Sequence, residues 1–143
     1  MTEDGDAATQ GSESGEGGGS GLGRVLEDLR SLSGEVEAGY VVSGEGGILA
    51  STVEGGGERA GAMISALSSA STRRARERGH EAYSQVRVRA EEGYVLLTRL
   101  SDGSTLAATT GPEARVGLVL YDMRNARPEA ERVLSGTSGG DDA

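Results

Sequence analysis

The sequence predicts an α/β protein of the α+β kind, with one five-stranded antiparallel sheet and helices on both of its faces. Segments in which apolar and polar residues alternate come in two groups, and glycine-containing turns separate the members of each group. A long segment with helical spacing joins the two groups, and another segment with helical spacing lies at each end. The expected order is therefore α-β-β-α-β-β-β-α, which a single sheet accommodates with short connections.

The first helix is expected over residues 22–33, followed directly by a hairpin. Its apolar face is made of residues three or four apart, namely Leu22, Val25, Leu26, Leu29 and Leu32, and Gly34 ends it. Residues 36–42 alternate as a strand, residues 44–46 (Gly-Glu-Gly) form a turn, and residues 47–53 return as the second strand. A helix with one apolar face of this length needs such a sheet to dock on.

A long helix over residues 58–78, ended by Gly79, carries two different stripes. Met63, Leu67 and Ala70 form an apolar seam, extended by Ile64 and Ala60, which we expect to face the sheet. The second stripe contains only small residues at helical spacing: Gly61, Ser65, Ser69 and Thr72. Because small side chains let another backbone come close, this stripe predicts a contact with something other than the sheet.

The last turns of this helix carry four arginines, Arg73, Arg74, Arg76 and Arg78. One interpretation is a solvated helix end, because positive charge is favourable near the negative end of a helix dipole. The other is a contact for an acidic partner or a nucleotide phosphate. The first is preferred, but four arginines in six positions exceed what a helix end requires, so these residues are also candidates for partner binding.

Three further strands and a last helix complete the domain. The strands are expected where the pattern has period two, over residues 86–90, 94–100 and 105–110. In the first of them Val86 and Val88 point to the same face. The last helix opens with Pro112 in its first turn, where the missing N–H costs little. It is expected to end near Arg127, because Pro128 disfavours helix at the residue before it.

Both ends of the chain are acidic, whereas its middle is nearly neutral. Residues 1–23 carry five acidic and no basic side chains, and they supply most of the net charge of −9. We expect disorder in residues 1–21, rich in Gly and Ser, and in most of residues 129–143, because so few apolar groups cannot offset the ordering entropy. No basic, aromatic surface for nucleic acid is expected, and no apolar run inserts into a membrane, so a cytoplasmic protein is expected.

The residues available for catalysis are few. The chain has no cysteine and no lysine, and its only histidine, His80, directly follows the helix-ending glycine. One histidine without cysteines cannot build a typical zinc site. Residues 55–57 are three glycines at a strand-to-helix junction, but the Lys-Ser/Thr of a phosphate-binding loop does not follow them. We therefore expect no enzyme activity, no metal and no cofactor, and a binding or scaffold module instead.

Three stretches carry a familiar pattern: VEAGYVVSGEGGILAST over residues 36–52, EEGYVLLTRLSDGSTLAATT over residues 91–110 and GPEARVGLVLYDMRNAR over residues 111–127. They resemble the Roadblock / dynein light chain superfamily, and within it the MglB-like bacterial regulators of Ras-like GTPases. The resemblance covers residues 22–128, which would form a Roadblock-like domain of profilin-like architecture.

The resemblance implies a homodimer without catalytic residues of its own. In the family, the helix between the second and third strands packs antiparallel on its twin, and the third strands pair into one continuous sheet. In this chain the corresponding interface would involve Gly61, Ser65, Ser69, Thr72, Val86 and Val88. The family also implies a small Ras-like GTPase as partner.

Two functions follow as hypotheses. The first is a dimeric, non-enzymatic regulator that modulates GTP hydrolysis by a small Ras-like GTPase through contact. The second is a homodimeric structural adaptor whose binding does not depend on the nucleotide. An enzyme of its own and a ligand sensor of profilin-like architecture are weaker alternatives, and a sensor would need a pocket with convergent polar groups.

Overall fold

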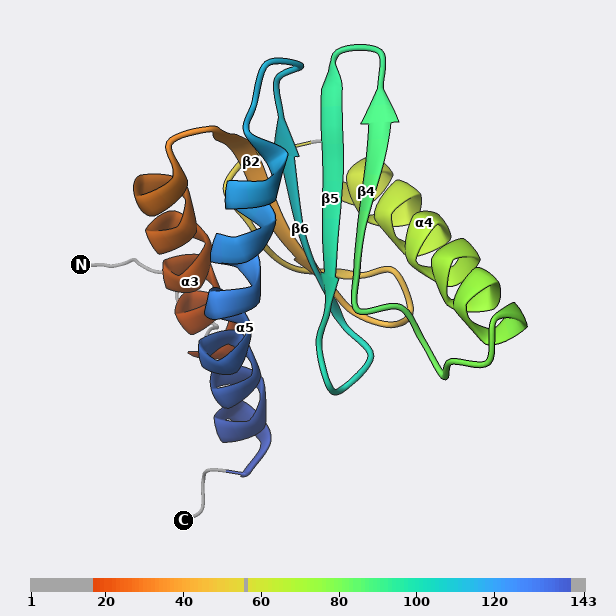
Figure 1. Cartoon of the computed structure of the whole chain (residues 1–143). Helices are drawn as coiled ribbons and strands as arrows, with labels where there is room; N and C mark the ends of the chain where they lie inside the picture. Colours follow the sequence, from red (N-terminus) through yellow and green to blue (C-terminus); the bar gives the residue numbers. More distant parts are fainter. Residues whose placement is uncertain (1–16, 56, 140–143) are drawn as a thin grey trace, which may run out of the picture.

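The fold is a five-stranded antiparallel sheet between two layers of helices, and a computed structural model describes it for residues 17–55 and 57–139. The elements follow in the predicted order: α3 (Gly17–Ser33), β2 (Val36–Val42), β3 (Ile48–Ser51), α4 (Gly57–Glu77), β4 (Gln85–Ala90), β5 (Gly93–Arg99), β6 (Thr105–Thr110) and α5 (Val116–Gly139). The strand order across the sheet is β3-β2-β6-β5-β4. Helices α3 and α5 lie side by side on one face and α4 lies on the other (Figure 1). The predicted fold class and element order are confirmed.

Two separate cores lie on the two faces of the sheet. Successive residues of β5 point in opposite directions, so Leu96 enters the core under α3 and α5 whereas Leu97 enters the core under α4. The α3–α5 core is the larger one and includes Leu26 and Met123, both fully buried. The α4 core is smaller and is centred on Ile64. Helix α4 is therefore held to the sheet by less apolar surface than the other two helices.

The two edges of the sheet differ. Strand β3 is only four residues long, and its pairing with β2 is interrupted by a register shift between Val41 and Val42. Strand β4 is six residues long and pairs with β5 in continuous register from Gln85 to Ala90. Short or irregular edge strands offer a poor template for a further strand, whereas a longer regular strand offers a good one. The β4 edge is the open side of this sheet.

Strand β5 begins at a glycine that passes close to the next strand. Gly93 has a φ of 156°, a conformation that side chains rarely allow. A Cβ atom built there would lie 1.8 Å from the carbonyl oxygen of Thr110 in β6. The turn between β4 and β5 therefore reaches its position against β6 only because residue 93 has no side chain.

The first helix starts earlier than predicted. Residues 17–21 belong to the segment expected to be disordered, but α3 begins at Gly17. At Gly21 the helix lies against α5, where an added Cβ would be 2.8 Å from Cγ1 of Val133. A tertiary contact thus stabilises a segment whose glycines alone disfavour a helix. The remainder of the predicted acidic tail, residues 1–16, lies outside the described residues.

The last helix differs from its prediction at both ends. Pro112 lies in a turn before the helix, which begins only at Val116. The carboxylate of Glu35 accepts hydrogen bonds from the backbone N–H and from Nε of Arg115, the residue that precedes the helix. These bonds hold the pKa of Glu35 below its ordinary value, and the bond from the backbone N–H contributes most. The negative charge of Glu35 favours a helix N-terminus at this point.

At its C-terminal end α5 continues through Pro128 to Gly139, so the predicted stop near Arg127 is wrong. Most of the predicted tail of residues 129–143 is helical, and only residues 140–143 lie outside the described part. Proline inside a helix removes one backbone hydrogen bond. Here Ala130 is fully buried in the α3–α5 core and Leu134 packs against it. Burial of the second half of the helix offsets the loss at proline.

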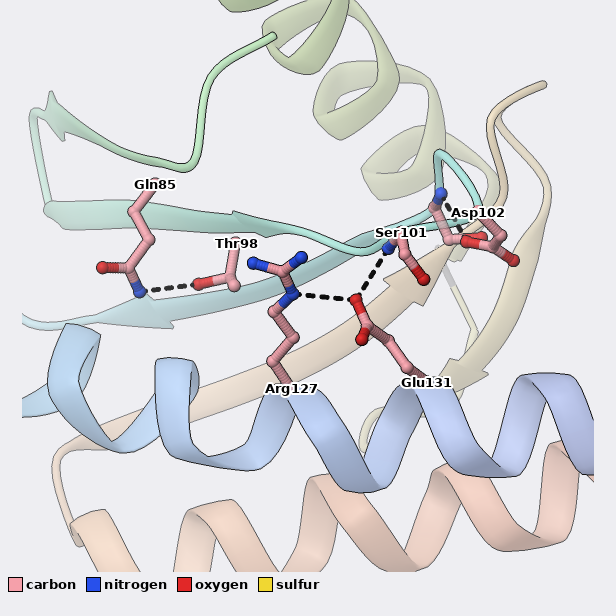
Figure 2. Close-up of polar contacts among 7 residues, drawn as sticks. Gln85, Thr98, Ser101, Asp102, Arg127 and Glu131 are labelled. Atoms are coloured by element: carbon pink, nitrogen blue, oxygen red, sulfur yellow. Dashed lines mark hydrogen bonds and ion pairs between the residues drawn. The ribbon is translucent and has the colours of Figure 1, made fainter.

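A polar anchor also fixes this second half, as Figure 2 shows. One carboxylate oxygen of Glu131 accepts a hydrogen bond from the backbone N–H of Ser101 at 2.7 Å and another from Nε of Arg127 at 2.7 Å. Ser101 belongs to the turn between β5 and β6, in which Asp102 accepts a bond from the backbone N–H of Ser104. The bond from Arg127, followed by that from Ser101, holds the pKa of Glu131 below its ordinary value.

Glu131→Gln is expected to lower the free energy of unfolding by about 1 kcal/mol near neutral pH, since it removes a charged hydrogen-bond acceptor at the surface. The folded pKa of Glu131 is lowered, so the wild-type stabilisation is complete above the ordinary pKa of about 4.3 and disappears as the pH falls through the folded value. The difference between variant and wild type should therefore shrink on acidification. Urea unfolding over a pH series measures it.

Glu129→Gln is the matched control on the same helix. Glu129 pairs with Arg132 on the exposed surface and not with another element, so its replacement should change stability by no more than a few tenths of a kcal/mol. Equal losses for the two variants, or a loss at Glu131 that does not vary with pH, would contradict the anchor.

Candidate functional site

The described residues contain no arrangement that suggests catalysis. No group of three or more metal-ligating side chains occurs in residues 17–55 and 57–139. His80 is exposed and follows the end of α4, where its backbone N–H donates to the carbonyl of Ala75 and that of Gly79 donates to the carbonyl of Arg76. With φ of 92° at Gly79, this is the Schellman arrangement that ends helices. Within the same residues no helix has the length and apolarity to cross a membrane.

Helix α4 faces the sheet with only part of the predicted apolar seam, which includes Ile64, Ala60 and Leu67. Ile64 is fully buried and Gly61 is buried, whereas Met63, expected to face the sheet, is 44% exposed. Ala70 is also exposed, and Leu67 is only partly buried. The sheet-facing side runs through Gly61, Ile64, Ser68, Ser71 and Ala75. The apolar seam is thus rotated away from the sheet centre and toward the side where β4 lies.

The predicted small-residue stripe does not lie on one surface, because part of it packs within the chain and part of it is exposed. Gly61 packs on the β2–β3 turn, where an added Cβ would lie 2.7 Å from the carbonyl oxygen of Gly46. Ser65 also lies beside Gly46, and Thr72 is partly buried. Ser69 alone among the four is exposed. At Gly61 and Ser65 the close approach therefore serves a contact within the chain.

An open groove lies between the C-terminal half of α4 and the start of β4. Its volume is about 570 Å³, and its apolar lining includes Leu67, Ala70, Ala75 and Val86. Val86 and Val88 are both partly buried, on the α4 face of β4. The groove runs along the open edge of the sheet. It brings together two residues of the seam, Leu67 and Ala70, and one of the two valines predicted to line an interface, Val86.

The four arginines at the end of α4 do not act as a unit. Arg74 and Arg78, one helical turn apart, line the groove together with His80. Arg76 donates from Nε to the carbonyl oxygen of Glu81 at 3.0 Å, which supports the helix end. Arg73 is exposed. Among the described residues none of the four forms an ion pair, so Arg74 and Arg78 leave a positive rim on an apolar groove.

A chain of hydroxyl groups lies below the groove, and sequence reasoning missed it. The Tyr83 hydroxyl is 2.9 Å from Oγ of Ser68 and 3.3 Å from Oγ1 of Thr105, and that Thr105 atom donates to Ser68 at 3.2 Å. These bonds join α4, the segment before β4, and β6. Ser68 lies on the sheet-facing side of α4, so a signal at Ser68 would have given the orientation of the helix. No local sequence pattern distinguishes Ser68 from the neighbouring serines.

Comparison with known proteins identifies the fold family. The family model of the Roadblock/LC7 domain matches residues 23–110. This range includes all five strands, helix α4, and helix α3 from its second turn onward. The chain belongs to the Roadblock/LC7 family. Comparison with curated protein sequences gave no significant match.

Solved Roadblock structures share the fold at low sequence identity. MglB of Myxococcus xanthus is 14% identical with a TM-score of 0.72, over 80% of this chain and 95% of that one. The gliding protein MglB of Thermus thermophilus is 13% identical with a TM-score of 0.73, over 88% and 97%. A Roadblock/LC7 domain from Streptomyces avermitilis is 18% identical with a TM-score of 0.73, over 80% and 98%. At these identities the similarity establishes the fold of the Roadblock/LC7 chain. Helix α5 begins after the last residue that the family model matches.

Proposed function

We propose that this Roadblock/LC7 chain is a homodimer that regulates a small Ras-like GTPase by contact. The observation that carries the proposal is the apolar groove between α4 and β4, which lies next to an open sheet edge. Both features are what the family's mode of dimerisation requires, in which twin helices pack together and edge strands pair. A GTPase is proposed as the partner because the sequence resembles MglB-like regulators.

The rotated seam of α4 makes the dimer contact chemically favourable. Met63 is 44% exposed, and Ala70 lies about two turns further along, on the wall of the groove. Covering them with the same surface of a second copy buries apolar area, and small residues such as Ala70 allow close helix packing. The proposed interface therefore consists of Met63, Leu67, Ala70, Val86 and Val88, with Ser69 at its outer side in place of Gly61 and Ser65.

The regulator acts without supplying a catalytic group. The described residues offer no metal cluster, and the sole histidine is exposed at a helix end. Hydrolysis of GTP depends mainly on positioning the attacking water and stabilising charge on the phosphates. A protein that presses on the loops of the GTPase changes the rate by moving the GTPase's own residues. Arg74 and Arg78, on the rim of the groove, are the proposed contacts for an acidic partner surface.

Phosphate release tests the proposal. The full chain is mixed with the Ras-like GTPase encoded nearest to its gene, loaded with GTP, and release is followed over time. The expected result is a rate change of at least tenfold, about 1.4 kcal/mol in activation free energy. An Arg74→Gln/Arg78→Gln variant should lose most of the effect, whereas Arg30→Gln, on the opposite face in α3, should keep it.

The adaptor hypothesis makes the opposite prediction for the same mixture. It requires a stable complex on size-exclusion chromatography with equal affinity for the GTP and GDP forms and no change in rate. Absence of both a rate change and a complex would contradict both functions for that GTPase.

A further inference from the structure

The outer surface of the α3–α5 layer exposes large apolar side chains that the fold does not use. Leu32 at the end of α3 is 69% exposed, and Leu118 and Tyr121 in α5 are 53% and 54% exposed. Leu118 and Tyr121 are three residues apart, so they lie on the same side of α5. These three side chains account for half of the six large exposed hydrophobic residues in the described part of the chain.

A groove of about 220 Å³ lies between the two helices at this surface. Its apolar lining includes Leu29, Leu32 and Ala126, and its polar lining includes Asp28 and Asp122. At roughly 30 Å³ for each water molecule, the volume corresponds to about seven waters, enough to accept a large side chain. The groove therefore offers an apolar slot with negative charge along both sides.

The charges beside the groove are not balanced within the chain. Glu129 is paired with Arg132, and Arg30 lies 3.5 Å from Glu27. Arg124 lies over the ring of Tyr121 at 5.7 Å from its centroid. Asp28 and Asp122 form no ion pair among the described residues, and no arginine lines the groove. Two carboxylates without an ion pair, one from each helix, therefore line the apolar groove.

We propose that the α3–α5 groove binds an amphipathic helix of another protein, with an apolar stripe flanked by arginine or lysine. A large apolar side chain of that helix fills the slot beside Leu29, Leu32 and Ala126, and adjacent apolar residues cover Leu118 and Tyr121. The flanking basic side chains pair with Asp28 and Asp122. Helices recognised in grooves use anchors spaced three and four residues apart, a spacing that matches a slot between two helices.

This surface is independent of the proposed dimer contact. Helices α3 and α5 cover one face of the sheet, and α4 with its groove lies on the other (Figure 1). A homodimer formed through α4 and β4 leaves the α3–α5 groove open on each copy. The basic-helix partner is accordingly a second protein that binds beside the GTPase interaction and does not compete with it.

A synthetic helix provides the probe. It contains about 18 residues, or five turns, with leucines three and four apart on one side, arginines on both flanks, and alanine and glutamine elsewhere. Fluorescence anisotropy of the labelled peptide with the full chain should show saturable binding with a Kd below about 100 μM. Asp28→Asn/Asp122→Asn and Leu32→Gln should each weaken binding at least about tenfold, because they remove the charge and the apolar wall respectively.

Two controls distinguish specific binding of the peptide in the groove from nonspecific attraction between peptide and protein. Leu49→Gln removes an exposed apolar side chain on β3, 37% exposed, and should leave the Kd unchanged. A peptide with glutamate in place of arginine should not bind. The proposal is overturned if the arginine peptide does not bind, if the aspartate variant binds it as well as wild type does, or if Leu49→Gln weakens it equally. If a proline-interrupted arginine peptide bound with the same affinity, the proposal that the partner binds as a helix would be wrong.

Discussion

Gly93→Ala is expected to lower the free energy of unfolding by about 3 kcal/mol or more. The new Cβ would lie 1.8 Å from the carbonyl oxygen of Thr110 and 2.8 Å from its carbonyl carbon, and both atoms belong to backbone that is paired in the sheet. Backbone cannot move aside as a flexible side chain does. The φ of 156° adds strain that alanine does not tolerate. Urea unfolding followed by circular dichroism measures the loss.

Gly23→Ala is the control for the glycine-to-alanine change itself. Gly23 lies in α3, and an added Cβ there has no neighbouring atom within 4 Å. Alanine favours a helix over glycine, so this variant should be as stable as wild type or more stable by up to about 1 kcal/mol. If Gly93→Ala unfolded at the same urea concentration as wild type, the close approach of β5 to β6 would not limit this position.

Ala70→Arg is expected to weaken the proposed homodimer by about 100-fold, or roughly 2.7 kcal/mol. Ala70 is exposed on the single chain and lines the groove between α4 and β4. A long charged side chain there would hold the twin helix away and would be buried without a partner. Sedimentation velocity over a concentration series measures the monomer fraction.

Ser69→Arg is the matched comparison, since it introduces the same side chain at the adjacent exposed position. Neighbouring helix residues point about 100° apart, and Ser69 does not line the groove. Ser69→Arg should therefore weaken the dimer much less than Ala70→Arg. The opposite ranking would restore the small-residue stripe as the interface. No change for either variant would place the dimer contact away from α4.

The strands were predictable because each is a short run of strand-forming residues bounded by turn residues. Val86 and Val88 lie on one face of β4 as expected, and each predicted strand agrees with the structure to within two residues at both ends. The cause is local: strands β2, β5 and β6 are buried on both faces, and a short apolar run between turns signals such a strand without reference to the rest of the chain. Turn glycines then fix where each strand ends.

The orientation of α4 was not predictable in the same way. Hydrophobicity favoured Met63 for the sheet-facing side, yet the buried residues on either side of it are Gly61 and Ile64. The reason lies in another part of the chain, because the carbonyl oxygen of Gly46 leaves no room for a side chain at that point. A helix with apolar residues on two sides gives no local signal of which side meets its own sheet.

The second half of α5 shows how tertiary contacts overcome a local signal. Pro128 predicts a helix end from its own geometry, but the burial of Ala130 and the bond from the Ser101 backbone to Glu131 depend on α3 and on the β5–β6 turn. Gly21 against Val133 has the same character at the start of α3. The start of α3 and the second half of α5 are each weakly helical alone, and each becomes helical because the other is present.

The unequal edges of the sheet limit how large an assembly can grow. An assembly in which β4 pairs with β4 of a second copy uses both regular edges, and only the four-residue β3 strands remain at its outer ends. Such short, irregular ends do not propagate strand addition. The proposed two-fold arrangement would therefore be self-terminating and would give closed pairs instead of open fibres.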